Sequence, residues 1–344
     1  MARNWAICVG VNEYDNLPNL QFAKRDAEQM QQYFLSDVKF DKVYLFTDDS
    51  PPIDDADKPY ASRPTYAALR RFLRVRFEEK FLSDGDNLWF FFSGHGIRHQ
   101  DRDYLLPSDA DPDPAGIDET AIPISYVSER LRRSGADNVI LLLDACRNEQ
   151  SSKDVGIGYD KQQGVITFSS CSPAERSYEI EPLEQGAFTY ALLESLRIQG
   201  EGNCATVERL SRQLKYRVKE INQYYEKPKQ TPQARLEPES KYHLILLPDA
   251  ATDQDIIILK NDAFKAEIQK EWNLAKQLWM RVNVAARGTD TDIVDAFARL
   301  HKETEFQGDQ NGDSIQTLNH QDFDFIDIFE NLNESISYKE STSE

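Results

Sequence analysis

Two short motifs contain the side chains best suited to chemistry, and each follows an apolar run. The first is Phe-Ser-Gly-His-Gly at 92–96, and the second is Asp-Ala-Cys-Arg-Asn at 144–148. A thiol becomes a nucleophile when a base removes its proton, and an imidazole can then deliver a proton to a leaving amine. His95 and Cys146 are therefore predicted to form the catalytic pair of a cysteine peptidase.

The positions of the two motifs strengthen this prediction. Apolar runs of this kind are typical of buried strands, and open α/β sheets build their sites just beyond the carboxyl ends of such strands. The spacing leaves room for one crossover helix, so the two side chains are expected to face each other across neighbouring strand ends. Gly94 and Gly96 are expected to allow tight turns, and the N–H groups of Gly96 and Cys146 are candidate oxyanion donors. The alternative is a core cysteine and an unrelated loop histidine.

The elements that must position these residues follow from the alternation of apolar runs with helical patterns. This alternation predicts an α/β fold with a mainly parallel sheet covered on both faces. The predicted strands are Trp5–Val11, Lys42–Phe46, Asn87–Ser93, Asn138–Asp144, Gly164–Ser170 and Lys241–Leu247. The predicted helices are Ala23–Leu35, Thr65–Phe81, Ser125–Arg133, Phe188–Arg197 and Ala205–Tyr224, with surface loops at Thr47–Ser62 and Pro107–Pro123.

The character of the chain changes after Pro248. Ile256–Arg287 and Thr291–Glu305 have helical patterns, and Gly308–Glu344 is polar and acidic. We therefore predict a principal domain over residues 1–249 and a helical, acidic C-terminal appendage over 250–344. Part of the tail is expected to be disordered, although its apolar residues offer an amphipathic segment that can dock: Phe323, Phe325, Ile326, Ile328 and Phe329.

The composition is that of a soluble, acidic protein. The 344 residues are 40% hydrophobic and 29% charged, and the formal net charge is −19. An acidic surface repels nucleic acid unless a basic patch is segregated on it, and no apolar segment is long enough to span a bilayer. We expect no nucleic-acid partner and no membrane association. Because no apolar signal segment opens the chain, we expect a cytoplasmic location.

The four cysteines are too few and too scattered for a disulfide framework or a zinc knuckle, so reduced thiols are expected. Cys8 is predicted to lie in the core, and Cys204 to be an exposed loop thiol. Cys171 is expected either to pack or to line a substrate subsite.

Together the motifs resemble those of the caspase-like cysteine peptidases, and in particular the metacaspase and bacterial orthocaspase branch. The resemblance covers residues 3–247. It implies a three-layer α/β/α sandwich with a six-stranded, mostly parallel sheet, and a His–Cys dyad at His95 and Cys146. The residues that carry it are the opening strand at 6–14, the segment Leu20 with 23–27, the motifs at 92–96 and 144–148, Tyr104–Pro107 with Asp109-Ala110, and Gly186–Thr189.

The same resemblance implies a preference at P1, the residue before the cleaved bond. Asp26 and Asp144 match the acidic residues that line the S1 pocket of metacaspases, whereas animal caspases bind a P1 aspartate through arginines. Paired carboxylates bind a guanidinium or ammonium group and repel aspartate, so we expect cleavage after Arg, with Lys as the second candidate. The alternatives are that Asp26 is a solvated residue at a helix start, and that Asp144 caps the helix that follows it. Arg25 is a further concern, because it can point inward and neutralise the pocket.

Residues 147–163 form a polar segment after the nucleophile, where members of this family are often cleaved or rearranged. Under a basic P1 rule, the candidate self-cleavage sites are Arg147, Lys153 and Lys161. A solvated loop carries such residues equally often.

No metal or cofactor is expected to be required. Metacaspases commonly need calcium, but acidic clusters are usually only solvated, and the orthocaspase likeness lowers this need. The segment 309–313 resembles half of an EF-hand loop, yet its glycine is misplaced and His320 stands where Glu is required. The acidic clusters are Asp48-Asp49, Asp54-Asp55 with Asp57, Asp109–Asp113 and Asp309–Asp313.

The leading hypothesis is an endopeptidase that acts on protein substrates with Arg or Lys at P1. It would stay inactive until a partner, a ligand or self-cleavage triggers it, and an activating protein would bind through residues 250–344. A second hypothesis is a catalytically idle scaffold that binds partners through its C-terminal helices. A third is a related His–Cys peptidase of the legumain or separase type. A role in bacterial defence or programmed death is an analogy from the family alone.

Overall fold

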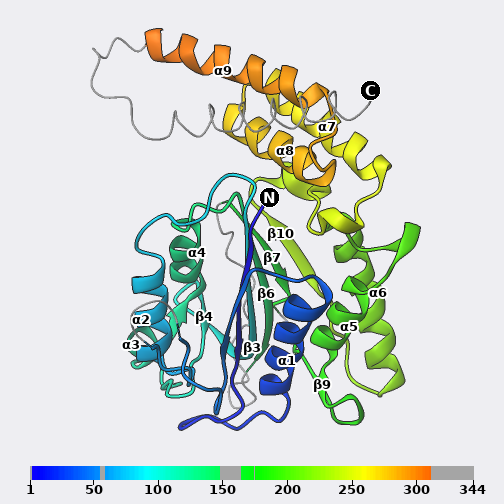
Figure 1. The fold of residues 1–344 in the computed structure, drawn as a ribbon. Coiled ribbons are helices and arrows are strands. Elements are labelled where there is room, and N and C mark those ends of the chain that lie inside the picture. The colour runs from blue at the N-terminus through cyan, green and yellow to red at the C-terminus, as the bar shows by residue number, and fades with distance from the viewer. Residues whose placement is uncertain (1, 55–58, 148–163, 174, 311–344) are drawn as a thin grey trace.

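The computed structural model describes residues 2–54, 59–147, 164–173 and 175–310. Its core sheet has the strand order β10-β7-β6-β3-β1-β2 (Figure 1). Neighbouring strands along this path are parallel, except that β10 runs antiparallel to β7. The predicted six-stranded, mostly parallel core sheet is therefore confirmed. Its strands are β1 (Asn4–Gly10), β2 (Lys42–Phe46), β3 (Asn87–His99), β6 (Asn138–Arg147), β7 (Val165–Ser169) and β10 (Gln233–Leu236).

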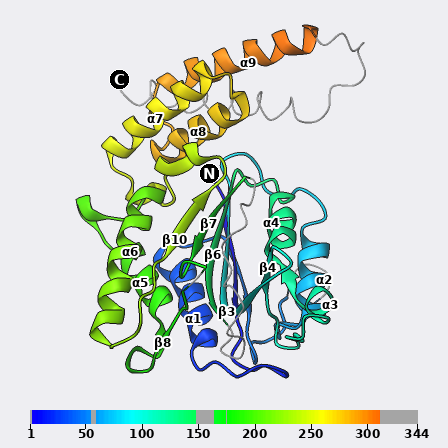
Figure 2. The ribbon, with the colours of Figure 1, turned by 180° about the vertical axis from the view of Figure 1, so that it is seen from behind.

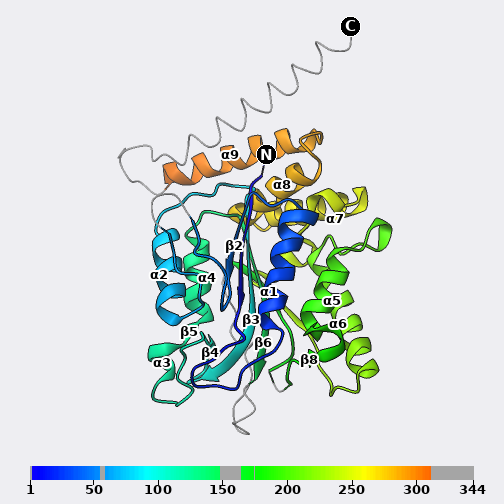
Figure 3. The same cartoon turned by 60° about the horizontal axis from the view of Figure 1, so that its bottom comes forward.

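Helices cover both faces of this sheet, which makes the three layers visible in Figures 2 and 3. Successive residues of a strand, such as Ile7 and Cys8 or Leu141 and Leu142, belong to two different apolar clusters. Because side chains alternate along a strand, this pattern shows burial on both faces. One layer is α1 (Ala23–Gln32), α5 (Ala187–Leu196) and α6 (Val207–Tyr224), and the other is α2 (Tyr66–Arg76) and α4 (Ile124–Arg132).

Smaller elements surround the carboxyl ends of the strands. β4 (Arg102–Leu105) pairs antiparallel with the end of β3, and β5 (Ile122–Pro123) pairs with β4. The helix α3 (Ile117–Thr120) lies in the segment that was predicted to be a loop. A separate hairpin consists of β8 (Glu179–Ile180) and β9 (Gln185–Gly186).

The prediction for the sixth strand was wrong in position. The strand is β10, whereas the apolar run around Leu244–Leu246 follows a 3-10 helix over Glu239–His243 and only bridges Thr206 through Ile245. An apolar run signals burial rather than a particular backbone conformation, and these residues are indeed fully buried. β10 was missed because its residues are half-buried and it contains only a weak apolar pattern.

Two strands extend further than predicted. β3 continues through His99 and β6 through Arg147, so the two motifs lie within the last strand residues and not beyond them. Gly94 therefore serves close packing and not a turn: a Cβ atom at this position would lie 2.7 Å from the hydroxyl oxygen of Tyr14.

The C-terminal appendage is helical and lies at the end of the sheet where the strands begin (Figure 1). The long helix predicted over Ile256–Arg287 is broken, because Lys270 has φ of 60° between two helices. The tail prediction for 311–344 lies outside the described residues. No helix in the described part of the chain is long and apolar enough to cross a bilayer. The three helices are α7 (Asp253–Ile268), α8 (Trp272–Ala285) and α9 (Asp292–Gln310).

The appendage shares a core with the sheet. Leu278 and Phe297 belong to the same continuous apolar cluster as Phe188 of α5, Leu210 of α6 and Trp89 of β3. Burial of this surface stabilises the appendage and the sheet together. The boundary at residue 249 stays a prediction about domains, but the packing is continuous across it.

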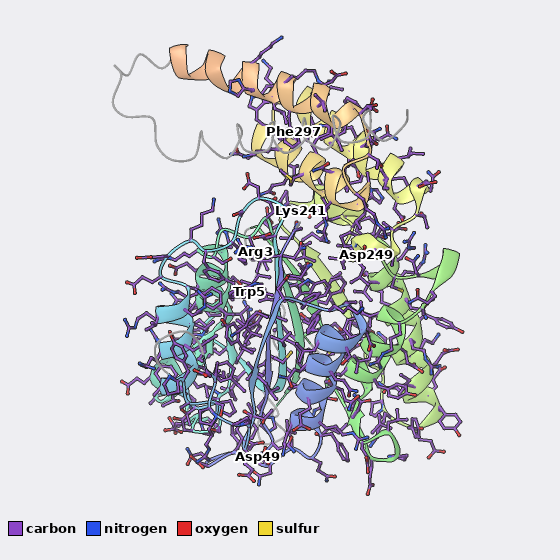
Figure 4. The ribbon with its side chains drawn as sticks, viewed as in Figure 1. Arg3, Trp5, Asp49, Lys241, Asp249 and Phe297 are labelled. Atoms are coloured by element: carbon purple, nitrogen blue, oxygen red, sulfur yellow. The ribbon has the colours of Figure 1, made fainter. Side chains whose placement is uncertain are left out.

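Charged side chains are also buried at this junction. Arg281 of α8 is 1% exposed, and it donates hydrogen bonds to the carbonyl oxygens of Ile245 and Leu246. In a sheet, a neighbouring strand would supply the N–H donors for these carbonyl groups, and here the Arg281 guanidinium supplies donors instead. Burial lowers the pKa of Arg281 to about 10, and the charge of Asp137 opposes this effect. Figure 4 labels Lys241 at the same junction.

Replacement of Arg281 by methionine is expected to destabilise the fold. Two buried carbonyl groups lose their donors, and each loss costs about 1–3 kcal/mol, so the free energy of unfolding should fall by roughly 2–6 kcal/mol. Urea unfolding followed by circular dichroism measures this change. Arg287→Met is the matched control, because the Arg287 side chain is 74% exposed and its pair with Asp249 is on the surface. Equal stability of both variants would contradict the assigned role.

Candidate functional site

The two motifs meet on adjacent strands. β3 and β6 are parallel neighbours in continuous register from the pair Asn87 and Asn138 onward. This register places His95 opposite Cys146 and Ser93 opposite Asp144. Directly opposed residues on adjacent strands have backbones about 5 Å apart, so the prediction that the histidine and the cysteine come together is supported by the backbone.

The His95 imidazole is held in one orientation. Its Nε2 atom lies 2.8 Å from the carbonyl oxygen of Pro18, and because a carbonyl only accepts, Nε2 carries the proton. In the neutral ring, Nδ1 then has the basic lone pair. The ring centroid lies 4.6 Å from that of Tyr14, with the two planes tilted by 50°, and the Tyr14 hydroxyl oxygen accepts a 2.7 Å bond from the His95 backbone N–H. The loop after β1 therefore fixes both the backbone and the tautomer of His95.

Two carboxylates gather beside this pair. Asp26 of α1 accepts hydrogen bonds from the Ser93 hydroxyl at 2.9 Å and from the Gly186 N–H at 3.1 Å. Asp144 of β6 accepts from the Ser177 hydroxyl at 2.6 Å, and from the hydroxyl and N–H of Thr189 at 2.7 and 3.2 Å. The two acids are 1% and 2% exposed. The structure therefore brings together the two residues that the sequence nominated for one pocket.

Gly186 lies between the two carboxylates. A Cβ atom on this residue would stand 2.5 Å from Asp144 Oδ2 and 3.0 Å from Asp26 Oδ2. An oxygen of each acid thus packs against the Gly186 Cα atom, and any side chain at this position would collide with both acids.

The environment opposes ionisation of these acids. Burial raises the pKa of Asp26 well above its ordinary value, and the charge of Asp144 raises it further, whereas bonds from Gly186 and Ser93 lower it. Burial also raises the pKa of Asp144 against the bonds from Ser177 and Thr189. Glu179 is a third acid in the cluster. Its pKa is raised by burial, and the Phe22 and Gln21 N–H groups that it binds oppose this. Such a cluster favours a bound cation.

The alternatives raised for these residues have clear outcomes. Asp26 lies in the first turn of α1 but is buried, so the description as a solvated helix-start residue is wrong. Asp144 accepts the N–H of Thr189, the third residue of α5, which is the first α-helix after it in the described part of the chain, so it does bind the start of a helix that follows it. Arg25 pairs with Glu184 and is half exposed, so it does not neutralise the pocket.

The remaining cysteines are buried. Cys8 lies in the core as predicted, and burial raises the pKa of its thiol. Cys171 is buried at the end of β7, with its thiol 3.6 Å from the Glu175 carbonyl oxygen. The prediction of an exposed loop thiol at Cys204 was wrong: its side chain is buried in the large apolar cluster, where burial raises its pKa to about 11. The preceding Gly-Glu-Gly-Asn segment suggested a surface loop, but the next residues enter the core.

Most of the acidic clusters serve local structure. Asp48 accepts the N–H groups of Asn12 and Glu13, Asp49 pairs with Lys24, and Asp109 accepts the N–H of Tyr66. Within the described ranges, no three His, Cys, Asp or Glu side chains gather in a way that could hold a metal ion. The cluster at Asp309–Asp313 and residues 55–58 fall largely outside those ranges.

Of the three candidate self-cleavage sites, only Arg147 lies within the described residues. Arg147 is the last residue of β6 and pairs in register with Gly96 of β3. Lys153 and Lys161 lie outside the described residues.

The candidate oxyanion donors are Gly96 and Cys146. Because Cys146 lies opposite His95, these two residues are one register step apart across the same strand pair.

Comparison with known families identifies a caspase domain over residues 3–242. The chain belongs to the caspase-domain family of peptidases. This membership confirms the resemblance predicted from the motifs, and the observed sheet order and layers agree with it.

Two curated relatives are informative. A probable protease of a Desulfuromonadales bacterium is 26% identical over 229 residues, which are 58% of this chain and 26% of that protein. Metacaspase-1 of Plasmodium falciparum is 26% identical over 200 residues, which are 51% of this chain and 31% of that protein. The chain therefore spans only about a quarter to a third of the length of these relatives. A solved Geobacter sulfurreducens protein matches with a TM-score of 0.47 and 16% identity, over 67% of this chain and 92% of that one.

Several contributors to the site carried no usable signal in the sequence. Pro18 acts through a backbone carbonyl, which any residue has, and Tyr14 was visible only as part of a motif. Glu179 and Ser177 lie far from both motifs along the chain. The Gly186–Thr189 segment was nominated by resemblance, and its contacts with both acids give that resemblance a physical basis.

Replacement of Asp26 by asparagine is expected to stabilise the fold at neutral pH. A carboxyl group whose pKa is raised on folding costs stability once the pH exceeds its unfolded value, and the full cost is present above the folded value. An uncharged amide removes that cost. The thermal midpoint should rise by a few degrees, since about 1 kcal/mol corresponds to roughly 2–4 °C in a domain of this size.

The gain should vanish as the pH falls below the ordinary aspartate range, because the wild-type carboxyl is then protonated in both states. Scanning fluorimetry between about pH 3 and about pH 8, a range that extends below the ordinary aspartate pKa, measures this dependence. Asp49→Asn is the control, since burial scarcely affects Asp49 and its pKa is lowered by Lys24. A pH-independent difference at Asp26 would refute the explanation.

Proposed function

We propose that this protein is a cysteine endopeptidase that uses His95 and Cys146 to cleave peptide bonds after basic P1 residues. The observation that carries this proposal is the register of β3 and β6. It sets His95 against Cys146, and Ser93, which binds Asp26, against Asp144. One strand pair thus joins a candidate dyad to a pocket with two acids. Membership of the caspase-domain family supports the peptidase class.

The first half of the reaction forms an acyl-enzyme. His95 Nδ1 takes the proton of the Cys146 thiol, and the thiolate attacks the carbonyl carbon of the scissile bond. The resulting imidazolium is stabilised by the Pro18 carbonyl, which accepts from Nε2. The tetrahedral intermediate then breaks its C–N bond, and Nδ1–H protonates the leaving amine. A thioester to Cys146 remains, and the imidazole is neutral again.

The second half releases the acid product. Nδ1 accepts a proton from a water molecule that attacks the thioester carbonyl, and the C–S bond breaks as the tetrahedral intermediate collapses. His95 returns the proton to Cys146, so no external acid or base is consumed. In both halves the oxyanion would be held by the N–H groups of Gly96 and Cys146, which lie diagonally across the strand pair.

The acid pocket supports a basic P1 residue. A guanidinium is planar and carries several donors, so it can contact both carboxylates that face Gly186. An ammonium group is a single point of charge and satisfies fewer acceptors, so Arg should be preferred over Lys. A P1 aspartate would add another negative charge to a cluster that already contains Asp26, Asp144 and Glu179.

The burial of the candidate site residues supports the idea that a trigger must open the site. His95 is 4% exposed, and the two acids are even less accessible. A substrate side chain reaches them only after something moves. An activator that binds the appendage would act from the opposite end of the sheet, where Figure 4 labels Arg3 and Lys241, whereas Asp49 marks the end that follows β2.

The competing hypothesis of an idle scaffold predicts no cleavage and no selective reactivity of Cys146. It is opposed by the orientation of the imidazole. The Pro18 carbonyl holds Nε2 in its protonated form, which leaves Nδ1 as the base, and a scaffold has no use for such a base opposite a cysteine on the neighbouring strand. A legumain-type preference for asparagine is opposed by the charge of the pocket, since a neutral amide would leave two buried carboxylates without a cation.

A panel of fluorogenic peptides that differ only at P1 tests the proposal. Wild type should cleave the Arg peptide fastest, the Lys peptide more slowly and the Asp peptide at background. Cys146→Ala should abolish cleavage, and His95→Ala should reduce kcat/KM by about 10²–10⁴-fold. Cys171→Ala and His99→Ala are the matched controls and should retain activity. Faster cleavage after Asp, or activity in Cys146→Ala, would refute the proposal, and iodoacetamide labelling of Cys146 separates an untriggered enzyme from an idle scaffold.

Gly186→Ala tests the pocket without changing its charge. Its methyl group would collide with both acids, so KM for the Arg peptide should rise by at least about tenfold, while iodoacetamide should still label Cys146. Gly202→Ala is the control, because nothing lies within 4 Å of its added Cβ atom. Unchanged kinetics in Gly186→Ala would place the P1 pocket elsewhere.

A further inference from the structure

The two acids of the pocket are held to different degrees. Asp26 accepts bonds from one hydroxyl and one backbone N–H. Both oxygens of each acid are engaged, but Asp144 has one donor more, because it accepts two hydroxyl bonds and a backbone N–H. Donors that point at a carboxylate favour its charged form and fix its direction. Asp144 is therefore the oriented acid of the pair, and its bond from Ser177 is the shortest of the set.

The direction of the Ser177 hydroxyl is itself determined. Gln230 Nε2 donates to Ser177 Oγ at 3.0 Å. A hydroxyl has one proton, so a serine that accepts from an amide must use that proton on another acceptor. Asp144 Oδ1, at 2.6 Å, is that acceptor. If the amide were absent, the Ser177 proton would no longer be committed to the carboxylate.

Gln230 cannot turn its amide around. Its Oε1 atom accepts from Asn222 Nδ2 of α6 at 3.1 Å, and its Nε2 atom also donates to the Ser170 carbonyl oxygen at 3.0 Å. A flipped amide would place donors against donors and acceptors against acceptors. Gln230 is 2% exposed and Asn222 is equally buried, so water does not compete for these bonds.

The backbone directly after Gln230 is also anchored. Glu175 accepts the N–H and the hydroxyl of Thr231, at 2.6 and 3.0 Å. Its further pair with Lys229, at 3.0 Å, is made by a lysine side chain that is 82% exposed. Glu175 and Ser177 belong to the same short loop after β7, so the Thr231 bonds attach the segment around Gln230 to the loop that contains Ser177.

We propose that Gln230 is a specificity-determining positioning residue that acts through Ser177 to keep Asp144 oriented and ionised for a basic P1 side chain. The inference rests on the proposed function for its substrate class, but the relay itself is a property of the fold. It runs from Asn222 on α6 through Gln230 and Ser177 to Asp144. Gln230 does not touch substrate in this scheme, and its effect reaches P1 only through the hydroxyl of Ser177.

The test is Gln230→Met, which keeps the side-chain length and removes the donors. KM for the Arg peptide should rise roughly fivefold or more, with kcat within about twofold, because the lost interaction acts on binding of P1. The acid limb of kcat/KM should move to higher pH, since Asp144 loses a donor that favours its charged form. Gln233→Met is the matched control: its amide donates only to the Thr231 carbonyl, and its kinetics should match wild type.

A double-mutant cycle separates the relay from general disturbance. Because Gln230 acts through Ser177, the variant with both Ser177→Ala and Gln230→Met should lose no more than Ser177→Ala alone. Ser177→Thr, which keeps the hydroxyl, should restore most of the wild-type KM. Additive losses in the double variant would overturn the proposal. If Gln230→Met does not fold, the comparison of Ser177→Ala with Ser177→Thr measures the same hydroxyl.

A readout without catalysis distinguishes this inference from the proposed function. The full chain with Cys146→Ala and ¹³C-labelled aspartate carboxyl groups is titrated by NMR, and the Asp144 signal is assigned by its loss in Asp144→Asn. Gln230→Met should shift that titration to higher pH, and Gln233→Met should not. A shift without any cleavage after Arg would retain the relay and refute the proposed function. Cleavage after Arg with an unshifted titration would refute the relay alone.

Discussion

The parallel pairing of β3 with β6 is the constraint on which the site depends. Ten consecutive residue pairs are in register from Asn87 with Asn138 to Gly96 with Arg147. A slip of one residue would reverse the face of every side chain on the moved strand, and the apolar clusters on both faces forbid it. The position of His95 opposite Cys146 is therefore stabilised by the whole hydrophobic core and not only by local contacts.

The same pairing carries an electrostatic cost. It places Asp144 in the interior beside Asp26, where burial raises the pKa of both acids. The fold offsets part of this cost with hydrogen-bond donors that include Ser93, Ser177, Gly186 and Thr189. A site that is destabilised while empty and satisfied by a cation is typical of functional pockets, because ligand binding then relieves the cost.

Much of the fold was accessible from the sequence, because continuous apolar runs and helical stripes have a direct relation to burial. The five parallel strands and the main helices follow from such runs, and resemblance paired Asp26 with Asp144. Features that depend on single side-chain contacts were not accessible. The run at Leu244–Leu246 is not a strand, because the Ile245 and Leu246 carbonyl groups are satisfied by Arg281, a helix residue that lies 36 and 35 residues later in the chain. No sequence pattern marks the contact of the Pro18 carbonyl with His95 or the contact of the Gln230 amide with Ser177.

The contact of Arg281 with the Ile245 and Leu246 carbonyls has a consequence for the order of events during synthesis. The family match ends at residue 242, but the core that supports β3 and β6 is closed only by α8 and α9. A nascent chain that has emerged as far as β10 contains every residue of the candidate site, yet its largest apolar cluster is still open on one side. Since domains fold as cooperative units when their cores close, a nascent chain is expected to complete this core once α8 and α9 have left the ribosome.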